Sequence, residues 1–523
     1  MQKNRFVILV ALTVALGGFL MGFDASVISG VNKFIELEFA LSKLELGWAV
    51  ASLTLSATIA MMLAGPLSDK IGRRKVLSYA AILYAISAIG SALAPSFLFL
   101  VVARMIGGLG VGASLIIAPM YIAEIAPAEM RGRMVSFNQL NIVLGISVAF
   151  FTNYLILQWG QSDAAWAQAL KFDEYNWRWM LGLEAFPAIL YFFGLFMVPR
   201  SPRWLIMKGE FDEALAVMTR ATGSEQAQKG FQEVKSSFKE DKPAGKTIIE
   251  DLWTLFKPSL RLVLSIGIVV AILQQITGIN SVFFYAPMIF EQSGIGTDAS
   301  FVQAILVGLV NLVFTILAIA FIDKLGRKPL LIFGVAGITI CMLLLSYGFN
   351  QATYTLTSDT VSTLPAEINQ EQIATMVGTT FDSDLSFKQA LVETLGEEQV
   401  QTYESQLITA AASMNSMLIL ISILGFVASF AISIGPVMWV LFSELFPNRI
   451  RGLAISFVGL INSGVSFGVQ LVFPWELATL GSSMTFLIYG AFAALGLVFI
   501  IWVVPETKGK SLEELEALLV KPE

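Results

Sequence analysis

The stretch Asp-Lys-Ile-Gly-Arg-Arg-Lys at residues 69–75 returns later in the same chain as Asp-Lys-Leu-Gly-Arg-Lys at residues 323–328. A second related pair follows: Glu-Ile-Ala-Pro-Ala-Glu-Met-Arg-Gly at 124–132 and Glu-Leu-Phe-Pro-Asn-Arg-Ile-Arg-Gly at 444–452. Each charged stretch lies between long apolar segments, in a chain of 523 residues that is 56% hydrophobic. The chain therefore contains one helical membrane plan twice. Internal repeats of this kind are typical of transporters whose two halves rock against each other.

Composition indicates an all-α membrane protein. Only 14% of the residues are charged, and the mean hydropathy of +0.74 is far above that of a soluble protein. Twelve apolar segments are long enough to cross about 30 Å of hydrocarbon. They lie near 7–30, 46–66, 76–95, 97–123, 134–158, 179–198, 260–290, 301–322, 329–349, 408–442, 452–473 and 483–504. No cleavage-site pattern follows the first segment, so we expect it to remain in the mature protein.

The distribution of basic residues predicts the orientation in the membrane. With the N-terminus in the cytoplasm, the inner segments carry 27 Lys and Arg residues and the outer segments carry four. Because cytoplasmic loops are enriched in Lys and Arg, both termini are expected to be cytoplasmic, in a multi-pass protein of the cell membrane. The acidic isoelectric point of 5.1 gives no indication of a nucleic-acid partner.

Polar stretches divide the chain into predicted domains. These are an N-terminal six-helix bundle at 1–199, a cytoplasmic linker at 200–259, and a C-terminal six-helix bundle at 260–523 that includes an extracytoplasmic insertion at 350–409 and a cytoplasmic tail at 505–523. In the linker, Phe211–Thr219 and Glu225–Phe238 are predicted as short amphipathic helices, with a break at 242–245. The insertion has nine acidic residues and one Lys. Its part Ser386–Ser405 is predicted to be helical, and we interpret it as a solvated cap, with gating or substrate capture as the alternative.

Rare residue types exclude some kinds of site. The chain has a single cysteine, Cys341, so an internal disulfide is excluded. It has no histidine, so imidazole serves neither as a metal ligand nor as a proton carrier. We find no glycine-rich nucleotide-binding loop, and we expect a protein that is not an enzyme and that needs no cofactor or metal.

The repeated charged stretches suggest a cytoplasmic gating network. Gly72 and Gly326 permit a tight turn between two antiparallel helices, where a side chain would obstruct close approach. Acidic and basic residues flank each turn and each following helix end at equivalent places in the two halves. The expected network consists of Asp69, Arg73, Glu124, Arg131, Asp323, Arg327, Glu444 and Arg451. The alternative is that these loops only set the orientation of the protein.

Taken together, these stretches resemble the loop signatures of the major facilitator superfamily. Five further stretches resemble the sugar porter family within it. They are Arg104–Gly112 (Arg-Met-Ile-Gly-Gly-Leu-Gly-Val-Gly), Pro199–Leu205 (Pro-Arg-Ser-Pro-Arg-Trp-Leu), Gln274–Asn280 (Gln-Gln-Ile-Thr-Gly-Ile-Asn), Gly435–Trp439 (Gly-Pro-Val-Met-Trp) and Pro505–Gly509 (Pro-Glu-Thr-Lys-Gly). The resemblance covers nearly the whole chain apart from 350–409. It implies the major facilitator fold, with twelve transmembrane helices in two pseudo-symmetric six-helix bundles.

Well-embedded ionisable residues occur only in the first half: Asp24, Arg104 and Glu184. Charges within the membrane are costly and usually mark a pathway or a relay. In the superfamily the first and fourth spans pack together, which implies that Asp24 and Arg104 are neighbours. An aspartate at this place resembles proton symporters of the family, so we predict that the pair couples transport to protons. The alternative is a static salt bridge, and for Glu184 we favour hydrogen bonding between helices.

Amides and one tryptophan form the predicted sugar site. A neutral, hydroxyl-rich ligand needs amide donors and acceptors beside a flat apolar surface. On an unbroken helix Gln275 and Asn280 would point about 140° apart, and Gly278 between them can loosen the helix. The predicted substrate-binding residues are Gln139, Gln274, Gln275, Asn280, Asn311, Trp439 and Asn462, with Gln139 assigned by the family resemblance. The alternative for each amide is hydrogen bonding between helices.

Departures from the family pattern leave the sugar open. Ile146 stands where some sugar symporters have a second glutamine, and Met21, Phe284 and Ser463 replace aromatic residues that are common in relatives. We therefore predict a secondary active transporter that takes up a hexose or pentose with a proton by alternating access. Its partners would be the sugar, protons and membrane lipid, without nucleic acid, and we expect a monomer. The alternatives are a facilitative sugar uniporter, a polyol or inositol symporter, and a sugar sensor.

Overall fold

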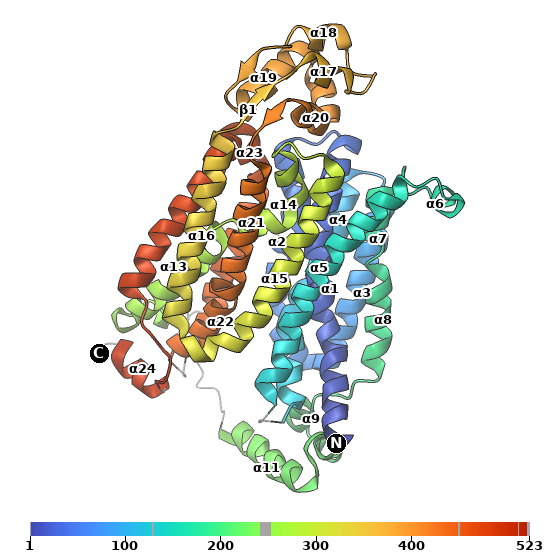
Figure 1. Cartoon of the computed structure of the whole chain (residues 1–523). Coiled ribbons are helices and arrows are strands. Elements are labelled where there is room, and N and C mark those ends of the chain that lie inside the picture. Colours follow the sequence, from blue (N-terminus) through green and yellow to red (C-terminus); the bar gives the residue numbers. More distant parts are fainter. Residues whose placement is uncertain (1, 128–129, 241–252, 448–449, 511, 520–523) are drawn as a thin grey trace. The chain divides into compact units, whose positions relative to one another are not determined.

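The computed structural model describes residues 2–127, 130–240, 253–447, 450–510 and 512–519. Eleven helices lie between Gln2 and Glu240 (Figure 1). They are α1 (Gln2–Glu38), α2 (Lys43–Ile71), α3 (Arg73–Ala92), α4 (Phe97–Ile125), α5 (Arg131–Gly160), α6 (Ala165–Ala169), α7 (Asn176–Gly182), α8 (Ala185–Phe196), α9 (Pro202–Lys208), α10 (Phe211–Thr222) and α11 (Ser224–Glu240).

The second half is also mainly helical, with three short strands between α16 and α21. Its elements are η1 (Pro258–Leu260), α13 (Arg261–Ile276), α14 (Ile279–Glu291), α15 (Thr297–Leu325), α16 (Arg327–Asn350), β1 (Thr353–Thr355), α17 (Ser358–Ser362), α18 (Gln370–Ala374), β2 (Thr380–Phe381), α19 (Asp384–Leu395), α20 (Glu397–Ala411), β3 (Ala412–Ser413), α21 (Ser416–Ile432), α22 (Ile434–Leu445), α23 (Arg451–Val503) and α24 (Leu512–Leu519).

Eleven helical stretches in the described part of the chain are long and apolar enough to cross a membrane. The last of them, α23, is 53 residues long, and its backbone leaves the helical conformation at Gly481, where φ is 78°. Two predicted spans, 452–473 and 483–504, lie on either side of this glycine. The twelve predicted spans are therefore all present in the structure. The tenth begins later than predicted, because residues 408–411 belong to α20 and the membrane helix α21 starts at Ser416.

Internal packing divides the chain into two compact units. Unit 1 contains Met1–Ser26, Ser52–Ala149 and Arg178–Phe256, and unit 2 contains Val27–Ala51, Phe150–Trp177 and Lys257–Glu523. Unit 2 thus includes parts of α1, α2 and α5 together with the second half of the sequence. The domain boundaries at 199 and 259 stay a prediction.

In unit 1, small residues allow the helices to approach closely. A Cβ added at Gly112 of α4 would lie 2.1 Å from the carbonyl oxygen of Ala57 in α2, and one at Gly108 would lie 2.3 Å from that of Leu53. These contacts are possible only without a side chain, as is common where membrane helices pack tightly. The close packing brings α4 to the place where its arginine can meet α1.

The described parts of the linker and of the insertion both contain helices. Helices α10 and α11 confirm the two predicted amphipathic segments, while the predicted break at 242–245 lies outside the described residues. Helices α19 and α20 confirm the predicted helical part of the insertion. The insertion also contains a three-stranded antiparallel sheet of order β2-β1-β3 and a core of its own. In Figure 1 it lies at one end of α16 and α21, and α24 lies near the other end of these helices.

Candidate transport site

Asp24 of α1 and Arg104 of α4 form a buried ion pair in unit 1. Arg104 donates from its Nη1 to Asp24 Oδ1 over 3.4 Å, and both side chains are 2% exposed. The second oxygen, Oδ2, has no hydrogen-bond partner among the described residues. It lies 2.9 Å from where a Cβ of Gly107 would be, so this glycine makes room for the carboxylate. The structure thus brings together the two residues predicted to couple transport to protons.

A second carboxylate belongs to the same buried group. Glu184, at the start of α8, is 2% exposed and interacts electrostatically with both Asp24 and Arg104. Its Oε1 has no hydrogen-bond partner within the described chain, so that oxygen does not take part in the helix-to-helix hydrogen bonding that we favoured. Two carboxylates and one guanidinium thus lie together, each almost fully buried. A full charge on both carboxylates would be costly there, and one proton shared by the group lowers that cost.

The seventh span breaks between its amides in unit 2, as the sequence suggested. Helix α13 ends at Ile276 and α14 begins at Ile279, and Gly278 between them adopts a left-handed conformation with φ of 88°. A Cβ at this position would lie 2.4 Å from the ring of Tyr489. Gly278 is therefore required both by the backbone conformation and by the space available.

The break lets the amides of α13 and α14 meet. Asn280 donates from Nδ2 to Gln275 Oε1 over 2.7 Å, and Gln275 Nε2 donates to Asn462 Oδ1 over 3.1 Å. Asn462 Nδ2 donates in turn to Gln274 Oε1 over 2.8 Å, and Gln274 Nε2 donates to the carbonyl oxygen of Gly435 over 3.2 Å. Four predicted sugar-binding residues thus form one network of neutral donors and acceptors.

Two residues that the sequence analysis missed extend this network. Ser466 Oγ accepts from Asn280 Nδ2 over 2.6 Å and from Gln470 Nε2 over 2.8 Å. Ser466 and Gln470 lie one and two turns after Asn462 on α23. That helical spacing was available in the sequence and would have identified both.

The other predicted sugar-binding residues lie outside this network. Trp439 is 43% exposed and lies 3.9 Å from the Cβ position of Gly459. Asn311 is buried in α15, and no hydrogen bond described in the structure joins it to these amides. Gln139 is exposed on α5 and belongs to unit 1.

The tenth span breaks at Ser433, just before the Gly435–Pro436 pair of the family-like stretch Gly435–Trp439. There α21 ends and α22 begins, with φ of −123° and ψ of −104°. Pro436 occupies the first turn of α22, where the missing N–H would have no helical partner in any case. The break therefore comes before the proline and leaves the carbonyl of Gly435 as an acceptor for Gln274.

In unit 1 the predicted gating residues are linked through Arg73. Its guanidinium contacts Asp69 Oδ1 at 2.7 Å and Glu124 Oε1 at 3.1 Å, joining the ends of α2 and α4 to the start of α3. The Ser201 hydroxyl also donates to Glu124, and the indole N–H of Trp204 donates to the carbonyl oxygen of Asp69 over 3.1 Å. The stretch at 199–205 therefore completes the network of the first half.

Unit 2 repeats the arrangement through Arg327. Its guanidinium makes a two-point contact with Glu444, at 2.7 and 3.1 Å, and the Thr507 hydroxyl donates to Glu444 Oε2 over 2.6 Å. The Glu506 carboxylate accepts from the backbone N–H groups of Arg327 and Lys328, each over 3.1 Å, and so caps α16. Thr507 thus takes the place that Ser201 has in unit 1.

Three predicted gating residues have a different position or are not described. The Arg451 side chain donates to the backbone carbonyl oxygen of Phe446 over 3.1 Å and not, in the described structure, to a carboxylate of the predicted network. The side chains of Arg131 and Asp323 lie outside the described residues. Among the described residues, no group of three His, Cys, Asp or Glu side chains could hold a metal ion.

The sequence and the fold were compared with known proteins. The family model described as "Sugar (and other) transporter" matches residues 10–366 and 400–519. The chain belongs to this family. The match omits 367–399, which lies within the insertion.

An arabinose-proton symporter from Bacillus subtilis is 34% identical to this sugar transporter over 516 residues, covering 99% of the chain and 96% of that protein. The D-xylose-proton symporter of Escherichia coli K12 is 34% identical over 548 residues, with the same coverage.

Solved structures resemble this sugar transporter over nearly its whole length. The inward-open xylose transporter XylE from E. coli has a TM-score of 0.74 at 33% identity, covering 98% of this chain and 100% of that one. The proton:xylose symporter XylE bound to 6-bromo-6-deoxy-D-glucose, a major facilitator superfamily protein, has a TM-score of 0.70 at 34% identity, covering 99% and 100%. The predicted major facilitator fold is confirmed, and the family is one of transporters and not of enzymes.

Proposed function

We propose that this sugar transporter is a monosaccharide:proton symporter of the cell membrane, with both termini in the cytoplasm. The observation that carries the proposal is the pairing of the buried side chains of Asp24 and Arg104, where Glu184 adds a second buried carboxylate. The names of the related arabinose and xylose symporters support the same assignment. We expect it to work as a monomer on a hexose or a pentose.

Proton coupling follows from the cost of buried charge. While Arg104 lies beside Asp24, the carboxylate is stabilised as an anion although it is out of water. If the helices that carry the two residues separate during the transport cycle, an unpaired buried carboxylate costs several kcal/mol. Taking up a proton removes that cost. The free energy of the proton gradient can therefore be transmitted to the movement of α1 relative to α4.

Sugar recognition is assigned to the amide network of unit 2. Each member can exchange a hydrogen bond with a neighbouring amide for one with a sugar hydroxyl, so the site does not leave unsatisfied groups when it empties. The half-exposed ring of Trp439 offers a flat surface for the C–H face of a sugar. Gln139 and Asn311 are proposed as further contacts when the site closes.

Gating is assigned to the two arginine-centred clusters. Arg73 with Asp69, Glu124 and Ser201, and Arg327 with Glu444 and Thr507, fix the ends of the helices at equivalent places in the repeat. We propose that rearrangement of these clusters accompanies the opening of the cytoplasmic side. We also propose that Arg131, Asp323 and Arg451 form or lose ion pairs with these clusters during that rearrangement.

The Asp24→Asn variant tests the coupling. An asparagine keeps the size of the side chain but cannot exchange a proton, so uphill uptake of sugar should fall to background while exchange of sugar across the membrane persists. Proteoliposomes with an imposed proton gradient, loaded with a panel of pentoses and hexoses, measure both quantities and identify the sugar. The exposed Asp359→Asn change in the insertion serves as the control.

A gradient-driven accumulation that survives in Asp24→Asn would contradict the symport proposal. The protein would then be a facilitative uniporter in which the Asp24–Arg104 pair is a static structural contact.

A further inference from the structure

The insertion between α16 and α21 is a small folded subdomain. Residues from β1 through β3 enclose a core of fifteen buried apolar residues, among them Tyr354, Phe387 and Leu391. The rings of Tyr354 and Phe387 stack at 5.4 Å. A segment with its own core and sheet holds its surface residues in fixed places, unlike a solvated loop. The contacts of these surface residues with the rest of unit 2 therefore indicate what the subdomain does.

One side of the subdomain is anchored to the turn between the last two spans. Asp384, at the start of α19, accepts from the backbone N–H of Ser482 over 2.9 Å and from its hydroxyl over 3.0 Å. These contacts cap the helix that follows Gly481. Asp384 is 9% exposed, so water competes little for these bonds. The subdomain is thereby fixed to α23.

The opposite side reaches the turn between α1 and α2. Glu404 of α20 lies 2.7 Å from Lys388 Nζ within the subdomain and 3.9 Å from Lys43 Nζ at the start of α2. Gln292 Nε2 donates to it over 3.2 Å, and Gln401 Nε2 donates to the carbonyl oxygen of Leu41 over 3.5 Å. Lys43 also contacts Glu36 at 2.5 Å, near the end of α1. A residue of the second half of the sequence is thus joined to the first two helices.

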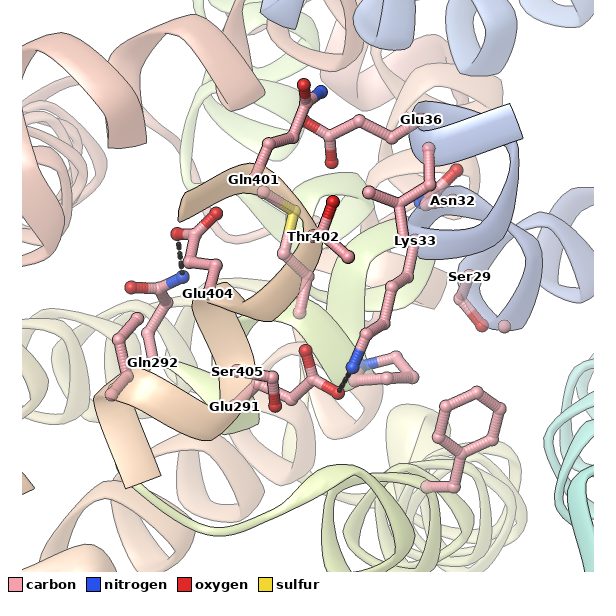
Figure 2. A pocket seen from close by; sticks show the side chains of 16 residues that line it. Ser29, Asn32, Lys33, Glu36, Glu291, Gln292, Gln401, Thr402, Glu404 and Ser405 are labelled. Carbon is pink, nitrogen blue, oxygen red and sulfur yellow. Dashed lines mark hydrogen bonds and ion pairs between the residues drawn. The ribbon is translucent and has the colours of Figure 1, made fainter. Parts of the chain in front are cut away.

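A narrow space lies beneath these contacts (Figure 2). Its volume is about 50 Å³, enough for a few water molecules but far below the roughly 300 Å³ or more of a ligand site. On its floor Lys33 contacts Glu291 at 2.9 Å and Thr297 at 2.7 Å. Asn32, which also lines the space, is 2% exposed and donates to the carbonyl oxygen of Phe284 over 2.8 Å. No sugar could pass through this space.

We propose that the subdomain is a latch that holds this side of the transporter closed. The latch consists of Glu404, Lys43, Lys388, Gln292 and Gln401. Lys33 of α1 contacts Glu291 of α14, and Trp48 of α2 contacts Phe467 of α23. Because Asp384 fixes the subdomain to α23, these parts of α1 and α2 can move away from α14 and α23 only if Leu41 and Lys43 leave the latch. The strength of these contacts then sets how often this side opens. This inference rests on the proposed transport function, in which each cycle requires that opening.

Accessibility of a cysteine beneath the latch tests the proposal without any sugar. The full chain carries Cys341→Ser, which removes the single native cysteine, and Ser29→Cys as a reporter that lines the narrow space. A membrane-impermeant maleimide is added from the side of the insertion, and the labelling rate is measured. Glu404→Gln and Lys43→Gln should each raise that rate about three- to tenfold, in keeping with loss of one partly buried ion pair. The exposed Glu398→Gln on the same helix should leave it unchanged.

The double variant Lys43→Gln/Glu404→Gln decides whether the two residues act together. A labelling rate no greater than that of the faster single variant supports the latch. Independent, multiplying effects would overturn it, as would a Glu404→Gln protein that is folded by circular dichroism yet labels at the parent rate. Sugar uptake measured in parallel keeps the two proposals apart. If the parent chain transports no sugar but the labelling pattern appears, the symport proposal fails and the latch stands.

Discussion

At the scale of a single residue, Gly278 decides how the sugar site is built. Its left-handed conformation separates α13 from α14, and the ring of Tyr489 fills the place where a side chain would be. An L-residue at φ of 88° is strained by about 1–3 kcal/mol, and the steric overlap adds to that cost. The amides of Gln275 and Asn280 meet only while this turn is kept.

Gly278→Ala is therefore expected to lower both stability and sugar affinity. The thermal unfolding midpoint in detergent should fall, with a loss of about 1–3 kcal/mol or more, and binding of the sugar found by the uptake panel should weaken. The control is Gly464→Ala in α23, where a Cβ would meet nothing within 4 Å. Equal midpoints for the two variants would show that the turn at Gly278 is not required.

Single residues also show how far the sequence could predict the site. Gln274, Gln275, Asn280 and Asn462 were found because amides are rare in apolar spans, and the break at Gly278 followed from its lack of a side chain. Ser466 was missed because a serine by itself gives no signal in a membrane helix, and only its spacing of one turn from Asn462 indicates its role. The pairing of Asp24 with Arg104 needed the family resemblance, since 80 residues separate them in the chain.

At the scale of the element, a carboxylate at the end of one helix fixes the start of another. Arg327 begins α16, and its planar guanidinium contacts both oxygens of Glu444 at the end of α22. A lysine ammonium is a point charge and cannot reproduce this two-point contact. Thr507 and Glu506 add further bonds from the stretch that follows α23.

Arg327→Lys should cost about 1–2 kcal/mol of stability through the lost hydrogen bonds. Thermal unfolding in detergent measures it, and the initial rate of sugar exchange is expected to change with it. Arg451→Lys is the matched control, because Arg451 donates to a backbone carbonyl that a lysine can also reach. If both variants unfold at the same temperature, the two-point contact contributes nothing that a lysine cannot supply.

Elements were predicted best where the apolar pattern alone decides them. The membrane helices follow from the length of the apolar segments, and the amphipathic helices α10 and α11 follow from the helical spacing of their apolar residues. The sheet of the insertion was not predicted, because its strands have only two or three residues and pair across 25 or more positions. The contacts of Ser201 and Thr507 were also missed, since each depends on a partner more than 60 residues away.

At the scale of the whole molecule, the charge distribution predicts which side of the membrane each loop faces. On the Cys341→Ser background, Glu398→Cys in the insertion should react with an impermeant maleimide added outside intact cells. Gln226→Cys in α11 should react only after the cells are permeabilised. Labelling of the α11 cysteine in intact cells would reverse the proposed orientation.

The latch should be insensitive to the pH outside the cell. Burial by itself acts to raise the pKa of Glu404, but the Lys388 and Lys43 ammonium groups, with hydrogen bonds from Lys388 and Gln292, hold that pKa below its ordinary value of 4.5. A carboxylate with a lowered pKa contributes its stabilisation at every pH above the ordinary value and loses it only as the pH falls through the lowered one. The other charged groups that line the space are Lys33 and Glu291, which form an ion pair at 2.9 Å, and Glu36, which contacts Lys43.

The ratio of labelling rates between Glu404→Gln and the parent should therefore stay constant from pH 8 to pH 5. It is measured with the Ser29→Cys reporter and corrected at each pH with Glu398→Gln, whose ratio to the parent should stay near one. A ratio that shrinks steadily between pH 7 and pH 5 would mean that Glu404 takes up a proton there and that the latch responds to external acid. A constant ratio of labelling rates would mean that the latch in unit 2 takes up no proton in this range. Proton exchange would then be confined to Asp24 and its buried neighbours in unit 1.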